Sequence, residues 1–400
     1  MVTTTLMTRC LSTVSASLIA LSSCGAAQAL EKSPYTIALS PSPRIQLDDG
    51  SFSVRLAGFL QLDHSDILTT EAQDDDGSTI RRSRIGIRGT LHSHWDYDWM
   101  LETGRGGTEI FDANVTYRGF KHVSVRFGQF KEPIGFEWAS GAPWWTFMDR
   151  ALVASISPRR SIGALATTGA KIWRAQVGYY SDNSTIAKSP DENGAWSGRA
   201  YLSPVHREGR VLHLGLSASH RTPDPTTKSV RFKAKHETAS LSAPTVDTKP
   251  IDHVDHSALI STEALAIFGP LSVQGESTYV RIVRDIGEDL NFSSSYVQLS
   301  YFLTGEARAY RFKRGAFARV KPKQSASSGA WELAARYGTL DLSDRDITGG
   351  SVDRYTVGLN WYPNTHMRFT MNGVLSETGS SGPNPNQTIK SLGLRAQLAF

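Results

Sequence analysis

The sequence predicts an all-β protein, a 16-stranded antiparallel transmembrane β-barrel with short turns at one end and long loops at the other. Apolar and polar residues alternate with a period of two in segment after segment. Sixteen such segments can be placed, and an even number lets a barrel close with both chain ends on one side. The connections between them alternate between short and long, as they do in membrane barrels.

Composition excludes several other classes of protein. The 400 residues are 40% hydrophobic and 20% charged, with 34 Gly and 17 Pro, which fits neither disorder nor collagen. No run of about 18 apolar residues is present to form a transmembrane helix. A formal charge of +5 is too small to indicate a nucleic-acid partner. Arginine makes up 30 of the 43 basic residues, and its planar donors favour phosphate or carboxylate anions.

Residues 1–29 are predicted to be a cleaved secretory signal peptide. A short basic start and a modest apolar run lead to Ala27-Gln28-Ala29, which has the small–x–small form of a cleavage site. Processing before Cys24, with a lipid on that cysteine, is the alternative. Cleavage after Ala29 would remove both Cys10 and Cys24 and would exclude disulfides. We expect residues 30–51 to form a periplasmic segment and residues 52–400 to form the barrel.

The strands follow in order along the chain. The first places Val54 and Leu56 on one face and Arg55 and Gln61 on the other, and the last alternates in the same way around Arg395. The segments begin near residues 52, 81, 95, 110, 122, 160, 170, 197, 211, 258, 271, 293, 330, 353, 366 and 388.

The connections give the two ends of the barrel. Short turns are expected at 92–94, 119–121, 168–169, 269–270 and 363–365, and long loops at 65–80, 131–159, 181–196, 222–257 and 376–387. Residues 304–329 break this alternation, because the connection is long but falls at the short-turn end. A barrel of sixteen strands is too wide for side chains to fill, so we expect an aqueous lumen that residues 131–159 narrow as a constriction loop.

A soluble β-sandwich would also give alternating strands, with the apolar faces packed against a second sheet. Several of these strands reach about ten residues, which is long for a sandwich and suits a tilted crossing of a bilayer. Aromatic residues such as Trp95, Trp99, Trp173 and Trp361 lie near the ends of the apolar faces, where a membrane barrel has its interfacial girdles.

Arginines dominate the predicted inner face. Arg82, Arg84 and Arg88 share one face of the second strand, Arg81 is adjacent, and Arg55 lies on the first strand. Like charges this close repel, so either a mobile anion compensates them or they pair with acids. The candidate acids are Asp63, Asp74, Asp75, Asp76 and Glu102.

Two further basic arrays lie in connections. If residues 231–235 are extended, Arg231, Lys233 and Lys235 project from one side, either into the lumen or as a solvated loop face. The other array surrounds Lys313 and Lys321 in residues 304–329, at the short-turn mouth. The sequence contains no nucleophile elbow, P-loop or dinucleotide fingerprint, so we predict neither an enzyme nor a cofactor or metal site.

Several motifs resemble those of the phosphate-selective porins O and P. They include residues 81–91, Gly128-Gln129-Phe130-Lys131-Glu132-Pro133, Phe147-Met148-Asp149-Arg150-Ala151-Leu152 and Tyr301-Phe302-Leu303-Thr304-Gly305-Glu306, and the match extends from about Phe52 to Phe400. This resemblance implies a porin in the outer membrane of a Gram-negative bacterium, usually a homotrimer, surrounded by lipid and lipopolysaccharide. It implies passive conduction of phosphate-type anions along a ladder of arginines.

The resemblance also assigns pore-lining residues. Arg81 and Arg82 match paired arginines of the family, Arg55 replaces a lysine, and Asp112 matches an acid near the constriction. The loop ladder is matched by Arg231, Lys233 and Lys235, the exit lysines by Lys313, Lys321 and Lys323, and Arg84, Arg88 and Arg126 complete the predicted lining.

Two departures from the family bear on the solute. Phe59 and Pro143 stand where the founding porins have Arg and Lys, and losing these cations weakens the predicted anion site. The predicted function is uptake of phosphate or related small anions. The alternatives are a porin for pyrophosphate, organic anions or sugars, and, in another class, a secreted β-sandwich hydrolase or adhesin.

Overall fold

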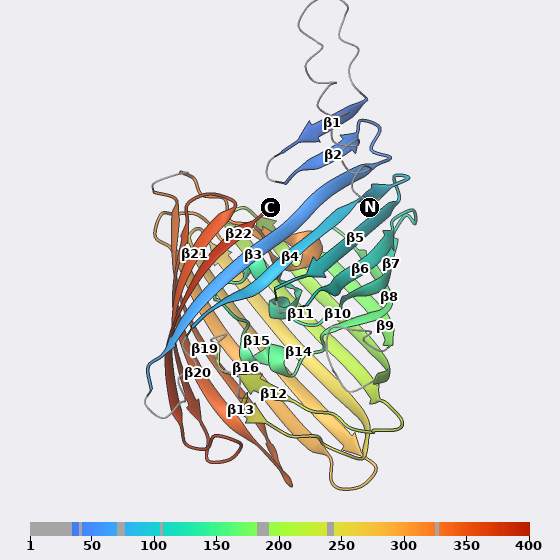
Figure 1. Cartoon of the computed structure of the whole chain (residues 1–400). Coiled ribbons are helices and arrows are strands. Elements are labelled where there is room, and N and C mark those ends of the chain that lie inside the picture. The colour runs from blue at the N-terminus through green and yellow to red at the C-terminus, as the bar shows by residue number, and fades with distance from the viewer. Residues whose placement is uncertain are drawn as a thin grey trace, which may run out of the picture.

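A computed structural model describes residues 34–39, 42–69, 77–104, 107–181, 192–237, 244–324 and 328–400. Sixteen antiparallel strands form a closed wall in chain order, and the last strand pairs with the first (Figure 1). Each predicted strand segment corresponds to one of them. They are β3 Ser53–Ile67, β4 Gly77–Leu91, β5 Trp95–Glu102, β6 Glu109–Tyr117, β7 Val123–Lys131, β8 Arg160–Gly169, β9 Trp173–Ser181, β10 Glu192–Arg207, β11 Arg210–Pro223, β14 Val254–Phe268, β15 Leu271–Arg284, β16 Leu290–Phe302, β19 Ala330–Asp344, β20 Ile347–Tyr362, β21 Met367–Thr378 and β22 Thr388–Ala399.

The outer surface of this wall is apolar and the inner surface largely polar. On β22, Arg395 and Gln397 point inward and are buried, whereas Leu394 and Leu398 point outward and are 44% and 45% exposed. Aqueous proteins bury apolar side chains, so the reversed arrangement is the one that lipid requires. Within the described ranges, no helix is long and apolar enough to cross a membrane.

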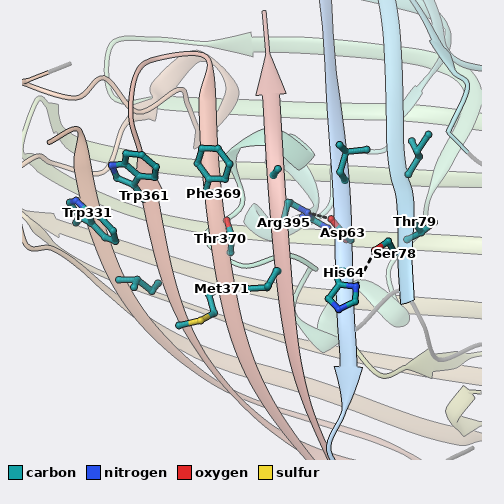
Figure 2. Close-up of a pocket in the computed structure, with 15 residues that line it drawn as sticks. Asp63, His64, Ser78, Thr79, Trp331, Trp361, Phe369, Thr370, Met371 and Arg395 are labelled. Atoms are coloured by element: carbon teal, nitrogen blue, oxygen red, sulfur yellow. Dashed lines mark hydrogen bonds and ion pairs between the residues drawn. The ribbon is translucent and has the colours of Figure 1, made fainter. Parts of the chain in front are cut away.

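An apolar hollow of about 710 Å³ lies in the outer surface, across β19–β22, β3 and β4 (Figure 2). Trp331, Trp361 and Phe369 stack along it, with ring centroids 5.7 and 5.4 Å apart. These rings belong to the outward face near one rim of the barrel, where aromatic girdles meet the membrane interface. The hollow therefore faces lipid and is separate from the lumen.

The connections confirm most of the predicted alternation. The short turns share one end with β1 (Tyr35–Ala38) and β2 (Arg44–Leu47), a hairpin that extends the sheet at the start of β3 (Figure 1). The turn expected at 168–169 is wrong by a few residues, because β8 continues through Gly169. The loop expected at 65–80 is shorter, because β3 continues to Ile67 and β4 begins at Gly77. The predicted cleavage site at Ala29 and both cysteines lie outside the described residues.

Three connections fold into the lumen. The described parts of these segments are 132–159, with α2 Phe136–Ala139, η1 Ala142–Trp144 and η2 Leu152–Ser155; 224–237 and 244–253, with β12 Lys233–Lys235 and β13 Pro244–Asp247; and 303–324, with β17 Tyr310–Arg311, η3 Phe312–Arg314 and β18 Ala316–Phe317. Residues 132–159 are the predicted constriction loop.

Hydrophobic packing holds these segments against one side of the wall. Ile134 of the constriction loop and Val246 of β13 belong to one buried cluster with inward residues of β14–β16, β19 and β20, such as Phe292 and Leu340. Phe136 and Phe317 join a second cluster with inward residues of β11 and β14. The lumen, expected to be aqueous, is therefore filled along this side, because apolar residues also face inward where the segments dock.

Candidate functional site

Water reaches the inner face of the short strands, β5 to β9. Their inward side chains, for example Asp98, Asn114, Arg126 and Gln176, are partly exposed. Inward side chains of β14–β22 are mostly buried beneath the three inward segments. The open part of the lumen therefore runs along β4–β9, and we call this the open path.

A β-bulge lets two adjacent arginines face the lumen. The register between β3 and β4 shifts between Gln61 and Leu62, which leaves Arg81 without a cross-strand partner. The guanidinium groups of Arg82 and Arg81 then both reach Oδ1 of Asp149 in the constriction loop, at 3.0 and 3.3 Å. The paired arginines predicted on this strand therefore hold the loop.

The other two arginines of β4 also have carboxylate partners. Arg84 Nε lies 2.6 Å from Glu102 Oε2, and Arg88 Nε lies 2.8 Å from Asp98 Oδ1, both on the neighbouring strand β5. Each pair joins strands that are hydrogen-bonded in register, so the side chains project from opposed positions. Each arginine of β4 therefore has a carboxylate partner, but Arg81 and Arg82 share the carboxylate of Asp149.

The alternative of acidic partners therefore accounts for three of the four charges, and one positive charge remains because Arg81 and Arg82 share Asp149. Glu102 is one of the acids proposed for that role. Asp63 instead binds Arg395 of β22, at 2.7 and 2.6 Å, and residues 74–76 lie outside the described residues. The remaining partners are Asp98 on the adjacent hairpin strand β5 and Asp149 in the folded loop, and sequence order does not place that loop next to β4.

A different cationic cluster lies where the constriction loop meets the open path. Arg160 donates to Asp112 through Nε at 3.0 Å and Nη2 at 3.3 Å, which places the predicted acid at the constriction. Lys131 Nζ donates to the carbonyl oxygen atoms of Trp138 and Ser140, at 2.7 and 2.9 Å. Among the described residues, no carboxylate oxygen lies within 4.0 Å of this ammonium group.

Arg150 is the second cation of the cluster without a carboxylate partner in the described part of the chain. Its guanidinium carbon lies 4.0 Å from the ring centroid of Trp138 and 4.2 Å from that of Trp145. Burial lowers the pKa of Arg150, and the neighbouring charges of Arg160 and Arg84 lower it further, although the carboxylates of Glu137 and Asp149 oppose this. Because a guanidinium stays protonated in proteins, this environment favours binding of an anion.

Aromatic rings separate the cations of the cluster. Phe111 lies between Arg84 and Arg160, whose guanidinium carbons are 3.3 and 3.5 Å from its ring centroid. Such contacts stabilise cations by about 0.5–2 kcal/mol and leave their N–H groups free to bind elsewhere. Arg84, Lys131, Arg150 and Arg160 carry four positive charges, and Glu102 and Asp112 carry two negative charges. Four less two leaves a formal charge of +2.

Asp149 anchors the loop beside this cluster. Burial would raise the pKa of Asp149, but the charges of Arg81, Arg82 and Arg395 outweigh burial and lower the pKa to about 2. The carboxylate therefore stays ionised at any physiological pH. It adds a negative charge next to Arg150, and Arg81 and Arg82 together more than neutralise that charge.

The loop array at 231–235 is extended as predicted. Arg231, Lys233 and Lys235 are exposed, whereas the alternate residues Ala234 and His236 are buried. Arg231 donates to Asp247 of β13 through Nε at 2.8 Å. Arg231, Lys233 and Lys235 therefore share one exposed face, and Asp247 compensates the charge of Arg231.

The predicted exit lysines lie at the short-turn end. Lys313, Lys321 and Lys323 are all exposed, and Lys323 Nζ donates to the carbonyl of Gly305 at 2.6 Å. Arg55 is also exposed here, close enough to Arg88 and Arg311 to feel their charges. These side chains form a cationic mouth at the short-turn end of the lumen.

The two departures from the family are both at the constriction. Phe59 is buried with Ala142, Trp145 and Ala399, where an arginine would have faced the lumen. Pro143 lies in η1, and its carbonyl accepts a hydrogen bond from Gln397 at 3.2 Å. At these two positions the side chains contribute packing contacts and no positive charge.

Sequence reasoning missed Lys131, Arg150 and Arg160 as site residues. The first two lie within the motifs that carry the family resemblance, and Arg160 begins β8. A usable signal was present, because Trp138 and Trp145 flank these cations within a loop expected to fold inward. The alternation of inward and outward residues could not identify these cations, because it applies within strands. Arg150 lies in a loop, and Lys131 and Arg160 lie at strand ends.

Comparison with known proteins identifies the family. The family model described as phosphate-selective porin O and P matches residues 54–400. The chain belongs to this family. It is an outer-membrane porin of Gram-negative type and not an enzyme.

Relatives and solved structures agree with this assignment. Porin O of Pseudomonas aeruginosa is 26% identical over 371 residues, which cover 82% of this porin and 84% of that protein. An uncharacterized protein of Caulobacter vibrioides is 28% identical and covers 92% of this chain and 78% of its own. An anion-selective porin from Comamonas acidovorans has a similar fold, with a TM-score of 0.56 at 15% identity over 87% of this chain and 100% of that one.

Proposed function

We propose that this porin conducts small anions along the open path and that phosphate-type dianions are its preferred solutes. One observation carries the proposal. The basic side chains of Lys131 and Arg150 lie at the constriction with no carboxylate within 4.0 Å in the described part of the chain, beside two arginines that have acidic partners. A mobile anion in this position would satisfy both cations.

The charge of the cluster favours a divalent anion. A dianion neutralises the formal charge of +2, whereas chloride leaves half of it uncompensated. Guanidinium and ammonium donors replace part of the hydration of the anion with charge-assisted hydrogen bonds. Release toward the cationic mouth around Arg55 and Lys313 then requires several weak sites in series, as in other selective channels.

The assembly belongs to the same proposal. We infer that residues 1–29 are removed as a signal peptide, that residues 30–51 and the short turns face the periplasm, and that the long loops face outward among lipopolysaccharide. We also infer a homotrimer. An OmpT of Vibrio cholerae with a similar fold, TM-score 0.55 at 11% identity, has been solved in a trimer form. Chemical cross-linking of the purified protein in detergent should give a trimer band, and a monomer band alone would contradict this.

Planar bilayers test the anion site. Under a salt gradient, the zero-current potential should show preference for anions, and phosphate should block the chloride current. In Arg150→Gln and Lys131→Gln, the dissociation constant for phosphate block should rise about tenfold. The reason is that each variant removes one charge-assisted hydrogen bond of about 1.5 kcal/mol.

Arg345→Gln is the matched control. Arg345 pairs with Glu288 on the exposed long-loop rim, so its loss should leave block and selectivity unchanged. Cation preference of the native channel, or unchanged block in both constriction variants, would overturn the proposal. Anion preference without phosphate block would instead favour a porin for other anions, such as pyrophosphate or organic acids.

A further inference from the structure

The constriction loop binds the barrel wall through its peptide carbonyls. Six of the seven carbonyl oxygens between Pro143 and Asp149 accept hydrogen bonds from wall or turn side chains, and Phe147 is the exception. In chain order the donors are Gln397, Arg308, Arg368, Asn360, Arg395 and Arg336. Three of these distances are ordinary, for example 2.9 Å from Asn360 Nδ2 to the oxygen of Thr146.

All six donors lie on one side of the loop. Five come from β19, β20, β21 and β22, and Arg308 comes from the inward turn 303–329. The cationic cluster lies on the other side, on β4, β7 and β8. The carbonyl oxygens of residues 143–146 and 148–149 therefore point away from the open path.

This direction matters for charge selectivity. A peptide carbonyl oxygen carries partial negative charge, and channels that present carbonyl oxygens to their ions select cations. In an anion channel the same groups would repel the solute. Saturating them with donors from the far wall removes that repulsion from the narrowest region.

We propose that the wall donors are positioning residues for selectivity, which hold the carbonyl oxygens of the constriction loop out of the anion path. The inference rests on the proposed anion selectivity. It predicts that donors such as Asn360 and Arg368, which do not reach the open path, change which ions pass.

Arg368 is the sharpest case. Its side chain is 1% exposed, and no carboxylate of the described residues lies within 4.0 Å of it. It donates instead to the oxygen of Trp145 and to Gln397 Oε1. A buried charge with no acid partner is costly unless it is hydrogen-bonded, so the loop carbonyl stabilises the arginine as much as the arginine holds the loop.

Asn360→Leu tests the idea without changing any charge. It removes the donor to Thr146, along with side-chain contacts to Glu332 and Thr370. In the full-length porin in planar bilayers, we expect the anion-to-cation permeability ratio to fall at least threefold and the open-channel current noise to rise. Arg368→Gln should do the same, and Arg368→Lys, which restores the charge and one donor, should recover part of both.

Arg354→Gln is the matched control for charge. Arg354 is a buried arginine on β20, but it donates to Ser376 and to the carbonyl of Lys235 in the other loop, and its Nη1 lies 3.9 Å from Glu237 Oε1. If loss of charge were the cause, Arg354→Gln would lower selectivity as much as Arg368→Gln while Asn360→Leu would not, and the proposal would fail. It would also fail if folded Asn360→Leu kept native selectivity and noise.

Asn360→Leu is replaced by Gln397→Met if the Asn360 variant does not show the heat-modifiable mobility of a folded barrel. Gln397→Met also changes no charge, and it removes the donor to the carbonyl of Pro143. The two proposals fail differently. A native channel that does not prefer anions contradicts the proposed function, whereas an anion-selective native channel with unchanged variants contradicts this inference alone.

Discussion

At the residue scale, compensation of charge decides which cations can act on a solute. Arg84 lies on the open path, and its charge is matched by Glu102, which is 3% exposed. The backbone N–H groups of Ser83 and Gly104 also donate to this carboxylate. Arg84 is therefore half of an ion pair and contributes no net charge to the constriction, whereas Lys131 and Arg150 do.

Arg84→Gln should therefore lower the stability of the porin as well as remove a positive charge. It leaves Glu102 buried without its cation, which destabilises a protein by about 3–5 kcal/mol. Denaturant unfolding followed by tryptophan fluorescence should show this loss, and the zero-current potential should shift toward cations. The double variant Arg84→Gln/Glu102→Gln should recover most of both. A single variant as stable and as selective as the native porin would show that the pair is unimportant.

At the scale of elements, the loop 224–253 is held in the lumen by a neutral histidine. His236 makes hydrogen bonds with Ser376 Oγ on β21 at 3.0 Å and Ser391 Oγ on β22 at 2.7 Å. Burial, and then the charge of Arg354 on β20, lowers the pKa of His236 from 6.5 to about 3, although Asp149 opposes this. His236 therefore stays neutral in the docked loop at pH values at which it would be protonated in the undocked loop.

Docking of this loop should weaken in acid. Its stability is fully present above pH 6.5 and falls as the pH drops toward 3, because protonation then favours the undocked state. The loss is about 2 kcal/mol at pH 5. Proteolysis of residues 224–253 should be faster at pH 5 than at pH 7.5, and His236→Gln should abolish the difference. Equal rates at both pH values in the native porin would contradict the prediction.

At the scale of the whole molecule, the barrel is asymmetric in cross-section. Loops and the long turn fill the side of β11, β14–β16 and β19–β22, and the side of β4–β9 is left open. Strands β5–β9 have 8 to 10 residues, whereas β14–β16 and β19–β22 have 12 to 16. The long strands provide the wall on which the inward segments dock.

Two adjacent residues of β9 test which surface meets lipid. Val177, 54% exposed, points outward at the middle of the strand, and Gln176 points into the lumen beside Thr167. Val177→Arg should destabilise the barrel by about 2–4 kcal/mol, because it places a charge in the bilayer. Gln176→Arg should be tolerated and should raise anion preference. Heat-modifiable mobility after folding into vesicles measures the difference, and equal folding of both variants would place β9 outside the bilayer.

The sequence predicts the architecture well because the relevant signal is local. Alternation with a period of two locates the sixteen strands and their two faces, and connection lengths separate the two ends. Even the connection at 304–329, which is long but lies at the short-turn end, can be recognised in the sequence. Errors are confined to strand ends, such as Gly169 in β8, where turn chemistry is weak.

The sequence alone determined the barrel, its lipid-facing surface and its excess of inward arginines, since each depends on residues a few positions apart. Tertiary structure decided which arginines are compensated. Asp63 meets Arg395, 332 positions away, and Asp149 reaches β4 because its loop folds back across the lumen. Electrostatic partners depend on distance in space, so the uncompensated charge at Lys131 and Arg150 emerges when the loops are in place.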